Sequence, residues 1–153
     1  MKIGVVGPYP PPYGGVSISI KQCSEIWASE GHEVHVINFT TSSGTRMVKK
    51  VFVHDVAAGE SLKKRMSSAI SNLTYPNMKY VSSFLARGYS IPECIEFLLI
   101  NGKVERICRN YHIEILHSHH LLGSGTVVAW AVSERLGIPF IVTGYGEAWQ
   151  FHN

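Results

Sequence analysis

Residues 2–39 decide the fold: KIGVVG at 2–7 leads into the loop GPYPPPYGG at 7–15, a helical segment at 16–30 and the run EVHVINF at 33–39. The first run is rich in β-branched residues, as an inner parallel strand would be. The loop has four prolines and three glycines in nine residues, which excludes helix and central strand. Strand, loop, helix and strand form a βαβ unit, for which a right-handed crossover is expected.

The helix predicted at 16–30 has an apolar stripe at helical spacing, formed by Val16, Ile20, Cys23 and Trp27. Its polar side chains fall mostly on the opposite face, which we expect to face solvent: Lys21, Gln22, Ser24, Glu25 and Ser29. Gly31 follows directly and is a natural C-terminal stop.

Strands and helices continue to alternate after this unit. We predict a strand at 47–56, which Lys49 and Lys50 interrupt as in an edge strand. The other elements are expected as helical segments within 60–89, a helix at 91–111, a strand at 113–118, a largely buried helix at 123–136 and a strand at 139–144. This alternation predicts an α/β fold, a Rossmann-like parallel sheet with helices on both faces, in one domain over residues 1–153.

The composition is that of an ordinary globular domain. Of 153 residues, 45% are hydrophobic and 16% are charged, and this length suits one core. The net charge of +3 is too small to indicate nucleic acid as a partner. No apolar run is long enough to cross a bilayer and the N-terminus lacks a signal-peptide pattern, so we expect a cytoplasmic chain. The cysteines form no CxxC and are interpreted as reduced core thiols: Cys23, Cys94 and Cys108.

Three loops should meet at one edge of such a sheet. Ligands bind outside the carboxyl ends of parallel strands, and the loops at those ends cover residues 8–15, 119–125 and 144–149. They contain a Gly-Gly pair, a histidine cluster and a Gly-Tyr-Gly-Glu sequence. Because such residues have little structural reason to gather at one edge, the sequence predicts a ligand site there.

Gly14 and Gly15 precede the first helix. Glycines at this position let backbone N–H groups approach an anion closely, and the helix dipole adds to the attraction. Phosphate or pyrophosphate is therefore the expected ligand, and the alternative is a glycine pair that only shapes a sharp turn. The segment is neither GxGxxG nor GxxxxGK[ST], which counts against a nicotinamide or flavin site and against a P-loop NTPase.

The histidine cluster His117-Ser118-His119-His120 follows the strand at 113–118. In an extended chain, His117 and His119 share one face and His120 takes the other. We expect His117 to be buried and hydrogen-bonded. His119 should lie at the rim, where it can contact a sugar hydroxyl or phosphate and handle protons near neutrality. The alternatives are a zinc site, which would need a third ligand, and rim histidines without a role.

Tyr145 lies between two glycines, which leave it room to turn toward the cleft. Its ring is suited to stacking on a sugar, and Glu147 is suited to accepting hydrogen bonds from hydroxyl groups. The alternative is an ordinary loop.

Four segments in this order carry a family resemblance: the proline- and glycine-rich loop at 8–16, EGHEVHV at 30–36, ILHSH at 115–119 and LGIPFIVT at 136–143. Together they resemble the N-terminal domain of family 4 (group 1) glycosyltransferases, which have the GT-B fold. Each segment is modestly specific, and their ordered combination is much more so. The resemblance covers the chain except for about residues 40–111. One departure is Tyr145, where many relatives have a histidine.

The resemblance implies retaining transfer of a sugar from a nucleotide-sugar donor to an acceptor hydroxyl, as in polysaccharide biosynthesis. His119 would be catalytic, and Gly14, Gly15 and Val16 would lie on the donor diphosphate side. The acceptor side would comprise Tyr9, Tyr13, His120, Tyr145 and Glu147. The resemblance implies no tightly bound cofactor and no metal, which fits the lack of an Asp-x-Asp sequence, since Asp55 is the only aspartate.

The family's second, donor-binding domain is not found in this sequence. We therefore expect residues 1–153 to fold but to be inactive without that domain as a partner. The alternatives are a non-catalytic binding or regulatory module, a subunit of a split transferase, and a zinc-dependent hydrolase that uses His117, His119 and His120.

The partly apolar segment between Glu60 and Glu93 contains no acidic residue but has five basic ones: Lys63, Lys64, Arg65, Lys79 and Arg87. Such a surface can rest on anionic lipid, here the inner membrane face, which would suit a lipid-linked acceptor. The alternative is a solvated face beside a core face.

Overall fold

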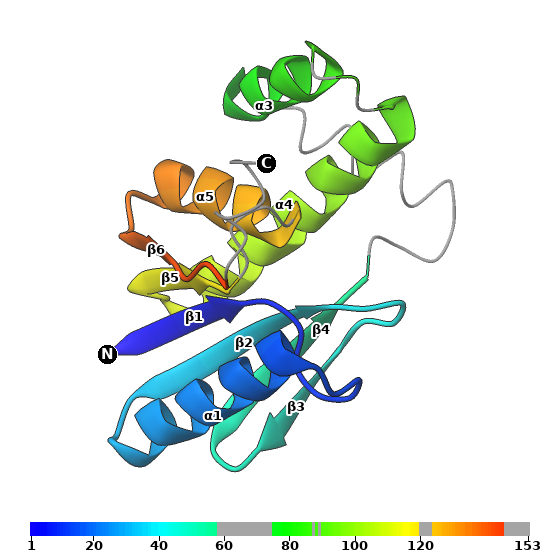
Figure 1. Cartoon of the computed structure of the whole chain (residues 1–153). Helices are drawn as coiled ribbons and strands as arrows, with labels where there is room; N and C mark the ends of the chain where they lie inside the picture. Colours follow the sequence, from blue (N-terminus) through cyan, green and yellow to red (C-terminus); the bar gives the residue numbers. More distant parts are fainter. Residues whose placement is uncertain (58–74, 87, 89, 120–123, 146–153) are drawn as a thin grey trace.

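The structure, a computed structural model, describes residues 1–57, 75–86, 88, 90–119 and 124–145. Within them, six strands form one sheet in the order β3-β4-β2-β1-β5-β6 (Figure 1). The strands are β1 (Lys2–Val6), β2 (Glu33–Phe39), β3 (Gly44–Val48), β4 (Val51–Val56), β5 (Ile115–Ser118) and β6 (Phe140–Val142). The helices are α1 (Gly15–Ser29), α3 (Tyr75–Ala86), α4 (Ile91–Tyr111) and α5 (Ser124–Leu136).

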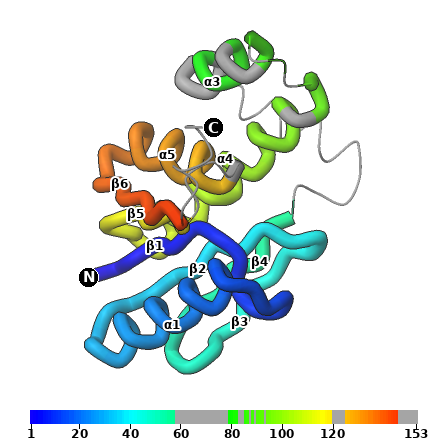
Figure 2. Tube along the Cα trace, in the orientation of Figure 1, coloured from blue at the N-terminus to red at the C-terminus, as the bar shows by residue number. Residues whose placement is uncertain are grey.

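Helices cover both faces of this sheet, as the Cα trace in Figure 2 shows. On one face, α1 packs on β-branched side chains of β1, β2 and β4, such as Val5, Val36 and Val53, which are fully buried. On the other face, α4 and α5 pack on residues such as Ile37 and Leu116. The α3 helix packs against α4 and α5. This arrangement confirms the predicted fold class.

The central strand β1 sets the position of the site. It pairs in parallel with β2 on one side and with β5 on the other, and β4 and β6 extend the parallel sheet outward. The chain therefore adds strands first on one side of β1 and then on the other. The carboxyl ends of β1 and β5 flank the point where the strand order reverses, which is where open α/β sheets bind ligands.

The strand predicted at 47–56 is in fact a hairpin. The chain runs along β3, turns at Lys49 and Lys50 and returns as β4, and the two strands pair antiparallel. Lys49 has φ of 47° and Lys50 has φ of 69°, and two consecutive residues with positive φ are what a tight two-residue hairpin requires. Lys49 and Lys50 therefore form the turn between two strands and do not interrupt one strand. The edge position in the sheet is taken by β3.

The buried face of α1 is rotated from the predicted apolar stripe. The buried residues are Ser17, Ile20, Ser24 and Ala28, whereas Val16, Cys23 and Trp27 are only half-buried. Ser24 was predicted to face solvent and is fully buried. Small side chains let a helix approach a sheet closely. The face of α1 that contacts the sheet is therefore made of Ile20 and three small residues, and the larger apolar side chains lie beside it.

The remaining elements agree with the predicted ones to within a few residues. The α4 helix has the predicted bounds, and α3 is the part of the helical region predicted at 60–89 that the structure describes. The α5 helix is mostly buried, as expected, although Trp130 is 43% exposed. Cys94 and Cys108 of α4 are buried free thiols, as predicted, whereas Cys23 of α1 is a free thiol that is only half-buried. In the described part of the chain, no helix has the length and hydropathy needed to cross a membrane.

Gly7 lies where β1 ends beneath α1, and it tolerates no side chain there. Its φ is +156°, and an added Cβ would lie 2.4 Å from Cδ1 of Ile20. We expect Gly7→Ala to lower the free energy of unfolding by about 2 to 4 kcal/mol, because overpacking is added to backbone strain. Urea denaturation measures this. Gly44→Ala is the control, since a Cβ there meets no atom within 4 Å; equal stability of both variants would contradict the prediction.

Candidate functional site

The loop after β1 places Gly14 and Gly15 at the start of α1. Gly14 is the N-cap residue with φ of −151°, which is extended backbone that any residue adopts. Gly15 begins the helix, and a Cβ at either glycine would meet no atom within 4 Å. Neither backbone conformation nor crowding by the described residues therefore requires glycine at these positions. This counts against the alternative that the pair only shapes a turn.

The first turn of α1 is held by Ser17. Its Oγ accepts a hydrogen bond from the N–H of Gly14 at 2.8 Å and lies 2.9 Å from the carbonyl oxygen of Pro12, to which its hydroxyl donates. The following N–H groups of the helix have no partner in the preceding turn, as at any helix start. They give this edge of the sheet a partial positive charge beside Gly15 and Val16.

His119 was predicted to lie at the rim of the site. It does lie at the carboxyl end of β5, but it is buried rather than exposed. Its side chain is only 2% exposed, and its backbone N–H donates to the carbonyl oxygen of Val6 on β1. Its ring lies 4.2 Å from that of His117, centroid to centroid, so the two histidines share a face as predicted. The correction concerns burial, because segments distant in sequence cover His119.

Tyr145 provides part of that cover. Its hydroxyl lies within hydrogen-bonding distance of Nδ1 of His119 and 2.8 Å from Oγ of Ser19 on α1. The side chain thus links α1 to the end of β5, and the ring is 39% exposed. Sequence reasoning placed Tyr145 beside an acceptor sugar, and in the structure its hydroxyl already has two protein partners.

The other ring nitrogen of His119, Nε2, is buried and has no hydrogen-bond partner among the residues that the structure describes. If the hydroxyl of Tyr145 donates to Nδ1, then Nε2 carries the proton and is a donor. In the reverse arrangement Nε2 is an acceptor. An unpartnered buried polar atom costs about 1 to 3 kcal/mol, so a ligand that bonds to Nε2 would remove this cost.

Burial, with a smaller effect of the nearby His117, lowers the pKa of His119 to about 4. Burial also lowers the pKa of His117, whose Nε2 lies 2.8 Å from Oγ1 of Thr143. His117 is half-buried and hydrogen-bonded, close to the prediction. Both rings are therefore neutral at pH 7, so His119 offers a hydrogen bond rather than a charge or a proton reservoir near neutrality.

The two tyrosines of the loop behave differently. Tyr13 is 72% exposed and Tyr9 is 3% exposed. Burial, with a smaller effect of Glu25, raises the pKa of Tyr9, and its hydroxyl has no hydrogen-bond partner in the described part of the chain. Of these two predicted acceptor contacts, only Tyr13 presents an accessible ring in this structure.

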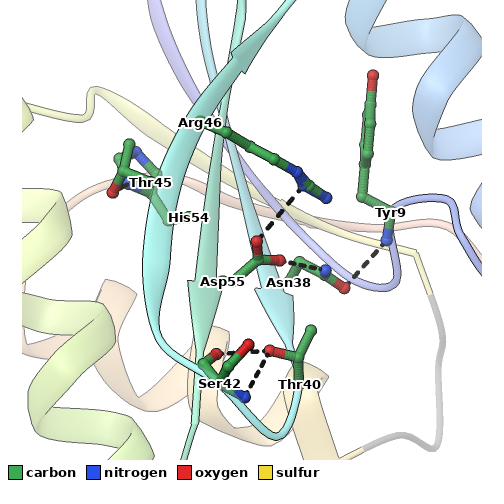
Figure 3. Close-up of polar contacts among 8 residues, drawn as sticks. All are labelled: Tyr9, Asn38, Thr40, Ser42, Thr45, Arg46, His54 and Asp55. Carbon is green, nitrogen blue, oxygen red and sulfur yellow. Dashed lines mark hydrogen bonds and ion pairs between the residues drawn. The ribbon is translucent and has the colours of Figure 1, made fainter.

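Polar side chains of three strands hold Tyr9 in place (Figure 3). The backbone N–H of Tyr9 donates to Oδ1 of Asn38 at 3.1 Å, and Nδ2 of Asn38 donates to Oδ1 of Asp55 at 2.6 Å. Oδ2 of Asp55 pairs with Arg46 at 3.4 Å, and the Arg46 guanidinium lies 5.8 Å from the centre of the Tyr9 ring. Sequence reasoning missed this network, although Asn38 in an apolar strand and the single aspartate were signals of it.

Two predicted site residues, His120 and Glu147, lie outside the described residues, as do Lys63, Lys64 and Arg65 of the proposed membrane contact. Over the part of the chain that the structure describes, no group of three or more His, Cys, Asp or Glu side chains is placed to hold a metal ion. Near one edge, the structure brings together the start of α1, His119 and Tyr145, with Tyr13 on the same loop as Gly14.

One family profile covers most of the chain. The sequence profile of Glycosyltransferase Family 4 matches residues 13–152, and no curated protein matches the chain. Among solved structures, the chain is similar to the apo structure of OtsA, with 12% sequence identity and a TM-score of 0.48 over 93% of this chain. The match covers 33% of the OtsA chain, so the present chain spans about a third of the length of that protein.

Proposed function

This chain belongs to glycosyltransferase family 4, and we propose that it is the N-terminal, acceptor-side half of an enzyme that transfers a sugar from a nucleotide-sugar donor to an acceptor hydroxyl. The other half of the site lies on a donor-binding domain, without which the chain is inactive. A site divided between two domains excludes water when the domains close, and water would otherwise hydrolyse the donor.

In the proposed reaction, the acceptor oxygen forms a bond to the anomeric carbon of the donor sugar. The bond between that carbon and the phosphate oxygen breaks, and its electron pair leaves with the nucleoside diphosphate. The acceptor's hydroxyl proton passes to the departing diphosphate, and the anomeric configuration is retained. Charge develops on the diphosphate, so groups that stabilise an anion contribute most to the rate.

The observation that carries this proposal is the open space at Gly14 and Gly15. The protein itself does not need glycine there, since the backbone is not strained and no atom of the described residues lies within 4 Å of either Cβ position. The glycines do leave the N–H groups at the start of α1 open to a bulky anion. A diphosphate therefore fits this end of the helix, with Val16 beside it.

His119 supports the same assignment. Its Nε2 is buried without a partner among the described residues, and its backbone N–H bonds to the end of β1. We propose that Nε2 bonds to the donor sugar or to the reacting oxygens once a bound donor displaces part of the cover over it. The lowered pKa keeps the ring neutral, so this contact is a hydrogen bond between an uncharged imidazole and an oxygen atom of the substrate.

The proposal includes the finer expectations from sequence. The acceptor contacts Tyr13 and Tyr145 at the rim, and no metal takes part. Any membrane contact would come from the basic segment that contains Lys63, Lys64 and Arg65.

The function is tested with a protein that contains this chain and a donor-binding domain. Purified protein is incubated with nucleotide sugars and acceptor sugars in the presence of EDTA, and release of nucleoside diphosphate is followed together with the product by NMR. The expected product keeps the anomeric configuration of the donor. An inverted product would contradict the retaining mechanism, and tight diphosphate binding without any transfer would favour the non-catalytic binding module.

The Gly15→Val variant separates a phosphate-binding role from a turn-shaping role. The side chain fits the protein, so we expect the thermal midpoint to change little. It fills the space over the helix start, so the KM for the donor should rise about tenfold or more. Ser29→Val is the matched control in the last turn of the same helix, where Ser29 is exposed. Unchanged donor kinetics in Gly15→Val would remove the glycines from the donor site.

A further inference from the structure

A pocket of about 460 Å³ lies between α4 and the β3–β4 hairpin, away from the site at β1 and β5. Its strand side is formed by the end of β4 and the start of β3, and its helix side by one face of α4. The lining residues used below are Thr45, His54, Lys103, Arg106, Asn110 and Tyr111. In the sheet order, β3 and β4 are separated from β5 by β2 and β1, so this is a second place on the molecule.

The side chains that α4 presents here carry positive charge. Lys103 and Arg106 are three residues apart and thus neighbours on the helix surface, and both line the pocket. Lys103 donates one hydrogen bond to the carbonyl oxygen of Ala57, which leaves further donors on its ammonium group. Arg106 is exposed. Within the described ranges, neither side chain has a carboxylate partner.

The nearby carboxylates are already engaged elsewhere. Glu105 pairs with Arg109 and Arg135, so it does not neutralise the pocket. Asp55 also contributes to the lining, but its two carboxylate oxygens bond to Asn38 and Arg46 beside Tyr9 (Figure 3). The two cations therefore face the pocket without a negative charge paired to them.

Besides the paired Asp55, the strand side of the pocket carries neutral polar groups. His54 is buried, and its burial, with a smaller effect of the neighbouring His35, lowers its pKa to about 4, so it is neutral at pH 7. Glu33 is ionised and only accepts, so Nε2–H of His35 donates to it and Nδ1 of His35 accepts from Nε2–H of His54. Nδ1 of His54 must then accept from the hydroxyl of Thr45 at 3.0 Å.

This chain of hydrogen bonds fixes what Thr45 offers to a ligand. Because its proton is given to His54, its oxygen keeps lone pairs that can accept from a ligand hydroxyl. Asn110 adds an amide that can donate or accept, and Tyr111, half-buried beside His54, closes the inner wall. The pocket thus combines two cationic donors at one side with neutral acceptors and an amide at the other.

We propose that this pocket binds a small hydroxylated molecule through its oxyanion, with Arg106 and Lys103 holding a carboxylate or phosphate and with Thr45 and Asn110 bonding to hydroxyl groups. A sugar acid and a sugar phosphate share this chemistry. Guanidinium groups bind either oxyanion in a forked geometry. The assignment does not depend on the transferase reaction.

The test is a titration of the ¹⁵N-labelled chain followed by NMR at constant ionic strength. The probes are glucuronate, inorganic phosphate and, as the uncharged match to glucuronate, glucose. Saturable shifts at the amides of Thr45, Arg106 and Asn110 are expected with an oxyanion and not with glucose. Tighter binding of glucuronate identifies a sugar carboxylate as the ligand type, and tighter binding of phosphate identifies a phosphate. No saturable shift with either oxyanion, or equal shifts with glucose, would overturn the proposal.

Two arginines of α4 give a matched pair of variants. Arg106→Gln should weaken oxyanion binding roughly tenfold or more, because it removes charge-assisted hydrogen bonds. Arg109→Gln removes the same charge from the same helix, but Arg109 is paired with Glu105 outside the pocket, so binding should stay within about twofold. Equal weakening by both variants would show diffuse attraction to a basic surface and would overturn the assignment. Both arginines are exposed, so neither change should unfold the chain.

Discussion

His119→Ala, in a protein that contains both domains, is expected to lower kcat/KM for transfer by about 10²- to 10³-fold, the usual effect of removing one preorganised hydrogen bond to a developing charge. The physical reason is the unpartnered Nε2 of His119, buried beside the carboxyl end of β1. A contact made mainly in the transition state should reduce kcat more than it changes the KM for donor.

Two further variants separate the chemistry of His119 from its packing. His119→Gln keeps a polar group near the position of Nε2 and should recover part of the lost activity. His32→Ala removes a histidine between α1 and β2, at the end of the sheet opposite His119, and should leave turnover unchanged. Urea denaturation accompanies each assay, because His119 is buried and its loss also leaves a cavity. Full turnover by a folded His119→Ala enzyme would exclude His119 from catalysis.

The free energy of unfolding is expected to fall steeply as the pH is lowered from 6.5 to 4. The pKa of His54 is about 4 in the folded chain and 6.5 without burial, so the unfolded state binds more protons between these values. Stability is then fully present above pH 6.5 and is lost as the pH approaches 4. A shift of this size corresponds to about 3 kcal/mol for His54.

Other groups act in the same direction. Burial lowers the pKa values of His35, His117 and His119 as well, and the hydrogen bond from His35 lowers that of Glu33. His54→Gln should therefore flatten the pH dependence between 6.5 and 4 without abolishing it. His112→Asn, a change at an exposed histidine with positive φ that asparagine tolerates, should leave the dependence as it is. Constant stability from pH 7 to pH 5 would contradict the prediction. Urea midpoints at several pH values provide the measurement.

Much of the fold was predictable from local patterns. The β-branched runs, the glycine and proline positions and the helical periodicity are all readable within about ten residues, and they correctly indicated a parallel α/β sheet. The same patterns marked the three loops that follow the parallel strands β1, β5 and β6. The family resemblance followed from those loops, and the family profile bears it out. The functional roles of Gly15, His119 and Tyr145 stay predictions.

The errors concern how one element packs or pairs with another, which the local pattern of a single element does not show. Lys49 and Lys50 looked like an interruption of one strand, because the sequence does not show that β3 folds back on β4. Ser24 looked polar and exposed, because only the docked sheet shows that a small residue is needed there.

The sequence by itself indicated the alternation of strands and helices, the class of sheet and the edge at which we expect a ligand, because hydrophobic period and turn residues act locally. Only the tertiary structure decided which side chains are accessible there. Tyr145, which is 26 residues away in sequence, contacts His119 and helps to bury it. Tyr9 is held by Asn38, which in turn bonds to Asp55. Burial depends on what packs over a residue, and hydrogen bonding and pKa depend on burial, so these properties arise only once distant segments meet.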